Sequence, residues 1–361
     1  MGTVLLGCIL PRVSTQWHLL DKNAGLLLFV QFATSASGAL LVRRYPRKTL
    51  ARGYGLAGLG GMGIFLAQQR SVWLFALALA AFGLGLGMAM TSTSMLVSRR
   101  YPDRRGAALA ILNFFWSVGA VACPLLVARF FPGTSSGPIF GLLGLLVFPF
   151  IALPLVVSSH AEESSANPMQ FGGISEARLI TNFALLAFLY VGIESAVGNW
   201  ISTFAIREVS WATMGSSRAA ATFWAALLLG RAITPAMLTM LEERHLVGLS
   251  LAFVIGGVGL LLAAHSSVTI LAGAAVTGLA LAPLFPLILS LFLSQASESR
   301  NAGWVFAVAG FGGAVLSWLA GVVSTIAGSL RIALLVPGAA ALLMLVIALR
   351  PITGGETRNN A

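Results

Sequence analysis

Eleven runs of apolar residues, most of them close to twenty residues long, alternate with short polar segments along the chain. A helix needs about 20 apolar residues to cross the hydrocarbon core of a bilayer. We therefore predict spanning helices over residues 24–42, 54–68, 72–97, 107–130, 138–158, 179–204, 219–240, 247–264, 268–292, 304–327 and 332–349. The sequence thus predicts an all-α integral membrane protein.

Charge supports this fold class and indicates an orientation. Only 9% of the residues are charged, against about 25% in soluble domains, which excludes a water-soluble fold. The net charge is +11, and successive polar segments lie alternately on the two sides of the membrane. This alternation places fifteen basic residues on one side and seven on the other. By the positive-inside rule the first side and the C-terminus are cytoplasmic. We expect a monomer in a bacterial inner membrane, in contact with the lipid bilayer and not with nucleic acid.

The first apolar segment, Gly2–Leu10, has only half the length of a span, and Pro11 follows it. We expect a truncated first helix that ends at this proline. Two explanations stay open: a start inside the first helix, which we favour, or a helix that is genuinely short.

A polar segment at residues 159–178 has no usable hydrophobic period and is interpreted as a cytoplasmic linker. It separates an N-terminal bundle, residues 1–158 (partial helix 1 to helix 6), from a C-terminal bundle, residues 179–361 (helices 7 to 12). Two such bundles are typical of transporters built from internal repeats.

Glu194 is the one acid of eleven that lies away from loops and helix ends. It is about 20 Å from the basic residue on either side of its span, near the midplane of the bilayer. A carboxylate at this depth indicates a functional site that binds a polar solute or a coupling cation. The alternative is a protonated Glu that joins two helices by a hydrogen bond. Tyr190 and Gly198 are on the same helix face.

Other polar residues are candidates for a solute cavity. Spans are numbered with the partial helix at Gly2–Leu10 as the first. In the fourth span, residues 72–97, we select Thr91 and Ser94, although such hydroxyls also bond to their own helix. The nearby Gly83, Gly85 and Gly87 favour close helix packing. Three residues of the fifth span share one face and suit a polar ring: Asn113, Trp116 and Ser117. Further candidates are Gln31, Trp224, Phe285 and Trp318, and two prolines in residues 278–286 predict a kink in the tenth span.

No other chemistry is indicated. Cys8 and Cys123 form no metal or disulfide pattern, and the four histidines have no ligand spacing. No nucleophile, base and orienting group cluster at one depth. We expect no metal, no cofactor and no enzymatic activity.

Several segments together resemble the major facilitator superfamily, and specifically its fucose-permease-like branch of sugar:cation symporters. They are SRRYPDRRG with LNFFWSVGAVACPLL, then FLYVGIES, FWAALLLGR, GLALAPLFP and GGAVLSWLAGVVSTIAGSLR. The resemblance implies two six-helix bundles with pseudo-two-fold symmetry, a central cavity and alternating access. It also places Arg231 at a gating position of the second bundle.

The loop RRYPRKTLARG lacks the acidic residue of the family's signature, the fourth span carries no carboxylate, and Ser317 replaces a proline. Proton coupling through the family's usual positions is therefore not inherited. The resulting hypothesis is a secondary transporter of a small polar solute, possibly a sugar, coupled to a proton or a sodium ion. The alternative is a non-transporting membrane sensor or assembly protein, or an inactive truncated transporter.

Overall fold

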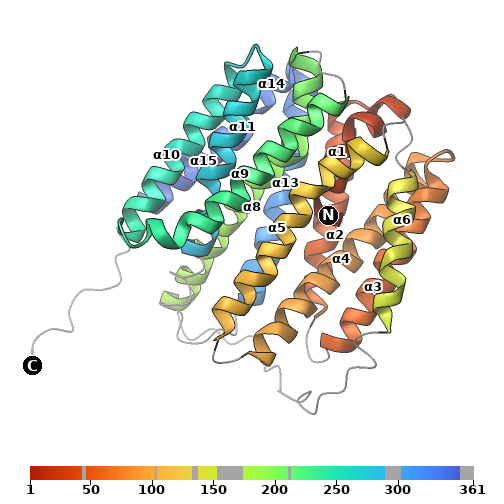
Figure 1. Cartoon of the computed structure of the whole chain (residues 1–361), viewed down its shortest axis with the longest axis horizontal. Coiled ribbons are helices and arrows are strands. Elements are labelled where there is room, and N and C mark those ends of the chain that lie inside the picture. The colour runs from red at the N-terminus through yellow and green to blue at the C-terminus, as the bar shows by residue number, and fades with distance from the viewer. Residues whose placement is uncertain are drawn as a thin grey trace, which may run out of the picture.

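The computed structural model describes residues 1–42, 46–101, 104–131, 137–152, 174–209, 213–288 and 302–349, which are helical almost throughout (Figure 1). The helices of the first half are α1 (Gly2–Gln16), α2 (Asp21–Leu40), α3 (Pro46–Ala67), α4 (Val72–Arg100), α5 (Arg105–Phe130) and α6 (Gly137–Val147), with the 3-10 helix η2 (Phe148–Ile151). Those of the second half are α8 (Ile174–Val209), α9 (Thr213–Met237), α10 (Glu243–Leu262), α11 (Ser267–Leu281), α13 (Ala302–Ala327), α14 (Leu330–Ala333) and α15 (Leu335–Leu349).

Within these residues, ten helical stretches are long and apolar enough to cross a membrane, which confirms the predicted class. The sixth predicted span is shorter where it is described, an apolar helix over Gly137–Ile151, and residues 153–158 lie outside the described part. Helix α8 begins at Ile174, inside the segment predicted as a linker, and residues 153–173 are not described. The helix of the tenth span ends at Leu281, and two turn residues follow it. The second of these is Pro283, one of the two prolines predicted to kink this span.

Helix α1 does not end at Pro11, contrary to the sequence-based expectation. It continues to Gln16, and the Thr15 hydroxyl donates a hydrogen bond of 2.8 Å to the Pro11 carbonyl. Arg12 then donates a hydrogen bond of 2.5 Å to the carbonyl of Phe131, and Gln16 donates one to the carbonyl of Gln68. A proline inside a helix removes one backbone hydrogen bond, and the tertiary contacts at the end of α1 offset this loss.

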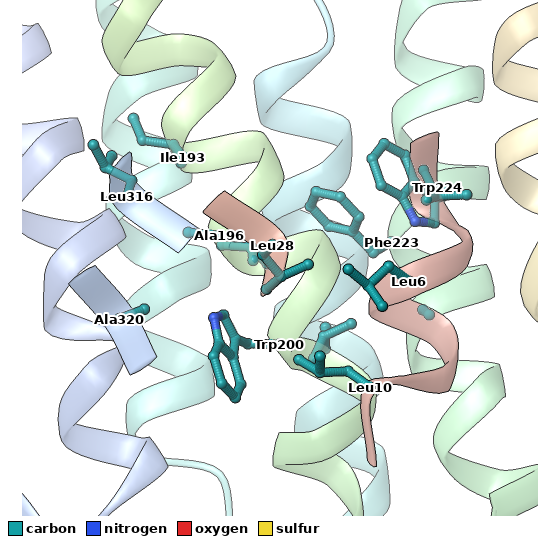
Figure 2. Packing of buried hydrophobic residues seen from close by; sticks show 14 of the residues in the cluster. Leu6, Leu10, Leu28, Ile193, Ala196, Trp200, Phe223, Trp224, Leu316 and Ala320 are labelled. Atoms are coloured by element: carbon teal, nitrogen blue, oxygen red, sulfur yellow. The ribbon is translucent and has the colours of Figure 1, made fainter. Parts of the chain in front are cut away.

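The helices form two groups that meet along two seams (Figure 1). Helix α2 of the first group packs on α13 of the second, and α5 of the first group packs on α9 of the second. Helix α1 lies between the groups and packs mainly on α8. Figure 2 shows Leu6 and Leu10 of α1 in one buried cluster with Ala196 and Trp200 of α8 and Phe223 of α9.

Glycines set the closest helix contacts. The predicted packing role of the fourth-span glycines is confirmed, because a Cβ on Gly83 would lie 2.5 Å from the Gln31 carbonyl oxygen and one on Gly85 would lie 2.6 Å from that of Gly53. A Cβ on Gly7 of α1 would likewise lie 2.7 Å from Cα of Asn199 in α8. Small residues let helix backbones approach in this way when no hydrophobic effect draws helices together in lipid.

Candidate functional site

Arg231 of α9 makes polar contacts with both groups of helices. Its Nη1 donates a hydrogen bond of 2.9 Å to the Ser117 hydroxyl of α5, and its Nη2 donates one of 3.3 Å to the Tyr190 hydroxyl of α8. Its Cζ lies 5.6 Å from the ring centroid of Trp116, within cation–π range. We call Trp116, Ser117, Tyr190, Glu194 and Arg231 the Arg231 cluster. Its side chains come from α5 in the first half of the chain and from the consecutive helices α8 and α9 in the second half.

Glu194 supplies the negative charge of this cluster. Its Oε2 lies 3.8 Å from Arg231 Nη2, the same nitrogen that donates to the Tyr190 hydroxyl. Glu194 is 7% exposed and Tyr190 is 1% exposed, so both of these side chains are largely withdrawn from solvent. The separation of 3.8 Å exceeds hydrogen-bond length, so Glu194 and Arg231 attract each other without a direct hydrogen bond. Each group therefore retains capacity for a further partner.

Ser117 connects the cluster to the other side of the seam. Its hydroxyl donates a hydrogen bond of 3.0 Å to the Asn113 carbonyl while it accepts the bond from Arg231. Ser117 is 1% exposed, whereas Asn113 is exposed. Of the three fifth-span residues predicted to share a face, the structure therefore brings Trp116 and Ser117 into the cluster, and Asn113 contributes its backbone carbonyl.

Aromatic rings surround the polar groups. The Trp116 and Trp224 rings meet edge to face with centroids 5.7 Å apart, and the Tyr190 and Phe285 rings lie 5.4 Å apart. Both indole nitrogens, Trp116 Nε1 and Trp224 Nε1, are buried and have no hydrogen-bond partner among the described residues. A buried N–H without an acceptor is rare and costly. Two such donors beside one ion pair indicate a place where acceptor atoms of a ligand can bind.

Two predicted candidates, Gln31 and Ser94, make their hydrogen bonds outside the Arg231 cluster, and a third, Thr91, makes no side-chain hydrogen bond within the part of the chain that the structure describes. Gln31 is buried, and its Nε2 donates hydrogen bonds of 3.2 and 3.4 Å to the carbonyls of Gly2 and Thr3, which joins α2 to α1. Ser94 donates a hydrogen bond of 2.9 Å to the Met90 carbonyl of its own helix. Thr91 is half-buried, whereas the neighbouring Ser92 is fully buried with no hydrogen-bond partner among the described residues. Helical period alone did not single out Ser92.

A second ion pair joins the two groups at the end where α2 begins and α8 and α13 end. Arg207 of α8 binds Asp21 of α2 through two hydrogen bonds of 2.6 and 2.7 Å, and Ser324 of α13 donates one of 2.5 Å to the same carboxylate. We call Asp21, Arg207 and Ser324 the Asp21 latch. Sequence reasoning missed it because both charged residues are at helix ends, where charges are common.

Close packing continues from the Asp21 latch along the seam between α2 and α13. A Cβ on Gly321 would lie 3.0 Å from the Asp21 carbonyl carbon, and one on Gly25 would lie 3.1 Å from Cα of Trp318. Trp200 of α8 donates a hydrogen bond of 2.8 Å to the Ser317 carbonyl next to this seam. The two groups of helices are therefore in direct contact at the end that carries the Asp21 latch.

The chain is also similar to known proteins. A family model described as Major Facilitator Superfamily matches residues 1–246, which is more than half of the chain. The chain belongs to the major facilitator superfamily. It is therefore a multi-pass membrane transport protein.

Relatives within this superfamily are distant. The glucose/mannose transporter GlcP of Bacillus subtilis is 22% identical over 339 residues, which cover 87% of this chain and 82% of GlcP. Among solved structures, FucP in the outward conformation has a TM-score of 0.65 at 17% identity, with 96% of both chains covered. A second structure, a variant of the Escherichia coli fucose:proton symporter FucP, has a TM-score of 0.62 at 16% identity and the same coverage. Both likenesses show the fold.

Proposed function

We propose that this superfamily member is a secondary active transporter of a monosaccharide, and that the Arg231 cluster binds the sugar and the coupling ion. The observation that carries the proposal is the pair of the buried Glu194 with the partly buried Arg231, which donates a hydrogen bond of 2.9 Å to Ser117 across the seam between the bundles. A solute bound at this place touches both bundles at once. Solute binding can then favour one arrangement of the bundles over the other, as alternating access requires.

The chemistry of the cluster supports a sugar. A monosaccharide offers several hydroxyl oxygens as acceptors and an apolar ring face. The unpartnered indole N–H groups of Trp116 and Trp224 can donate to hydroxyl oxygens, and Glu194 can accept a hydroxyl proton. The aromatic rings offer surfaces for the ring face. GlcP, by its name a glucose/mannose transporter, is similar over most of this chain.

Glu194 is the group that we assign to ion coupling, with a proton as the ion. A sodium ion bound at the carboxylate would lie next to the guanidinium of Arg231 and would be repelled by it. A proton instead neutralises Glu194 and frees Arg231 for Ser117 and Tyr190 alone. The structural neighbour FucP is described as a fucose:proton symporter.

The orientation of the transporter follows from its charge distribution. With fifteen basic residues on one side and seven on the other, the C-terminus is cytoplasmic and the Asp21 latch is on the outer side. In this orientation the latch and the glycine contacts of α2 and α13 close the outer side. The protein then works as a monomer in a bacterial inner membrane, with bundles at residues 1–158 and 179–361 and a linker between them.

Transport by the purified chain in proteoliposomes tests this proposal. A panel of radiolabelled hexoses, deoxyhexoses and pentoses, with amino acids as comparison solutes, is offered with and without an inward proton gradient and an inward sodium gradient. We expect accumulation of at least one monosaccharide that the proton gradient drives and the sodium gradient does not. Accumulation of amino acids alone, or driven by sodium alone, would contradict the assignment.

A further inference from the structure

A small pocket lies on the seam between the bundles, far along α5 and α9 from the Arg231 cluster. Its volume is about 180 Å³, and its lining residues are Leu125, Ala128 and Arg129 of α5 with Ser217 and Arg218 of α9. Helix α5 belongs to the first group of helices and α9 to the second, so the two arginines approach the pocket from opposite bundles. We propose that this pocket binds the headgroup of an anionic phospholipid.

Charge is the first argument for an anion. Arg129 and Arg218 have no ion pair with any carboxylate in the described part of the chain. The segments just beyond them, residues 132–136 (PGTSS) and 210–212 (SWA), contain no acidic residue. The two acids at this end of the helices, Asp21 and Glu208, are bound to Arg207 and Arg331 at 2.6 and 2.5 Å. Among the residues that the structure describes, the two guanidinium groups at this pocket thus have no carboxylate partner.

The surroundings favour a lipid over a free anion. Beside the pocket, α5 presents three large apolar side chains on its outer face: Leu125 is 47% exposed, Leu126 is 40% exposed and Phe130 is 64% exposed. The guanidinium of Arg129 lies 5.7 Å from the ring centroid of Phe130, above this apolar surface. Acyl chains can cover the apolar residues while a phosphate accepts hydrogen bonds from the guanidinium groups, a geometry that Arg favours.

A lipid at this pocket would also affect the bundles. A phosphate held by Arg129 and by Arg218 joins α5 to α9 at the end where the Asp21 latch joins α2 to α8 and α13. Both contacts favour the arrangement in which this end is closed. Binding itself does not depend on transport, so this proposal can fail while the proposed function stands. The proposed orientation determines only the leaflet, which is the outer one.

Lipid retention by the purified protein tests the proposal. Native mass spectrometry in detergent measures binding of phosphatidylglycerol and of phosphatidylcholine to the wild type, to the Arg129→Gln/Arg218→Gln double variant and to Arg70→Gln, an exposed arginine outside the pocket. We expect the wild type and Arg70→Gln to prefer phosphatidylglycerol, and the double variant to bind it at least five-fold more weakly. Equal phosphatidylglycerol binding by the double variant would overturn the proposal.

A second experiment distinguishes a bound lipid from a free anion. Glycerol 3-phosphate at millimolar concentration is added in place of the lipid while the melting temperature is followed. The lipid is expected to raise the melting temperature of the wild type and glycerol 3-phosphate to leave it unchanged, and an equal rise with both would overturn the lipid assignment in favour of a free anion. If the double variant does not fold, Arg129→Lys/Arg218→Lys takes its place, with weaker binding expected because Lys cannot donate two parallel bonds to a phosphate.

Discussion

Arg207 and Asp21 form a bidentate ion pair across the two bundles, with hydrogen bonds of 2.6 and 2.7 Å between the guanidinium and both carboxylate oxygens. Such parallel bonds are the strongest geometry that an Arg and a carboxylate can adopt. Ser324 bonds to the same carboxylate, so α2, α8 and α13 meet at one point. The ion pair must break before the bundles can separate at this end.

Asp21→Asn is therefore expected to open the end that carries the latch. Because Arg207 is 43% exposed, the pair is screened, and we expect a change of about 1 kcal/mol, which is about five-fold in the ratio of open to closed molecules. Pulsed electron–electron double resonance measures the distance between spin labels at Arg70 of the first bundle and Val268 of the second. In Asp21→Asn we expect a larger fraction of molecules with a long label-to-label distance. Lys22→Gln, at an exposed neighbour, is the control. No change in the distance distribution of Asp21→Asn would argue against the latch.

Glu194→Gln is expected to remove proton-driven accumulation, since an amide cannot carry the proton. Gln keeps the size of the side chain and its amide oxygen can still accept a hydrogen bond, so expression and downhill exchange of the sugar should remain within about three-fold of the wild type. Uptake in proteoliposomes with and without a proton gradient measures both quantities. Glu242→Gln changes a highly exposed carboxylate and serves as the matched control. Accumulation by Glu194→Gln at the wild-type level would remove Glu194 from coupling.

Arg231→Gln is expected to lower stability more than the double variant Glu194→Gln/Arg231→Gln does. The single variant leaves the buried Glu194 carboxylate without its counter-charge, at a cost of about 3–5 kcal/mol, whereas the double variant removes both charges of this pair. Thermal unfolding in detergent of the wild type, both single variants and the double variant gives the coupling energy between the two residues. Additive effects would mean that Glu194 and Arg231 do not interact.

Trp224→Phe is expected to weaken sugar binding without affecting the fold. Phenylalanine keeps an aromatic ring against Trp116 and Phe223 but removes the buried N–H, which has no protein acceptor among the described residues. Loss of one hydrogen bond to the solute corresponds to about 1 kcal/mol, or about a five-fold rise in Kd. Binding is measured by calorimetry on detergent-solubilised protein. Trp318→Phe, beside Phe29 in the other seam, should bind normally, and equal Kd values for both variants would disprove the role of Trp224.

Gly7→Ala is expected to destabilise the contact between α1 and α8. The added methyl would lie 2.7 Å from Cα of Asn199, so the helices must move apart at a cost of about 1–3 kcal/mol. The same substitution at Gly256 of α10, where a Cβ meets nothing within 4 Å, should be neutral or slightly stabilising. Melting temperatures of the two variants in one detergent make the comparison. A Gly7→Ala protein as stable as Gly256→Ala would contradict the tight α1–α8 contact.

The linear sequence was enough to predict the membrane-spanning helices and the packing role of Gly83 and Gly85, and it singled out Glu194 as an acid within a span. Apolar length decides whether a segment spans a bilayer, and depth along a helix follows from residue count at 1.5 Å per residue. These are properties of one segment at a time. Pro11 was misjudged for the same reason, because the contacts of Arg12 and Gln16 that continue α1 come from other helices.

Tertiary structure alone decided which polar residues meet. Helical period identifies the residues on one face but not the helix that covers that face, and lipid and neighbouring helices are equally apolar, so hydropathy cannot distinguish them. Hence Ser117, Tyr190 and Arg231 could not be joined from the sequence, nor could Asp21 and Arg207, which are 186 positions apart. Gln31, predicted for a solute cavity, instead bonds to the backbone of α1 because that helix happens to lie against it.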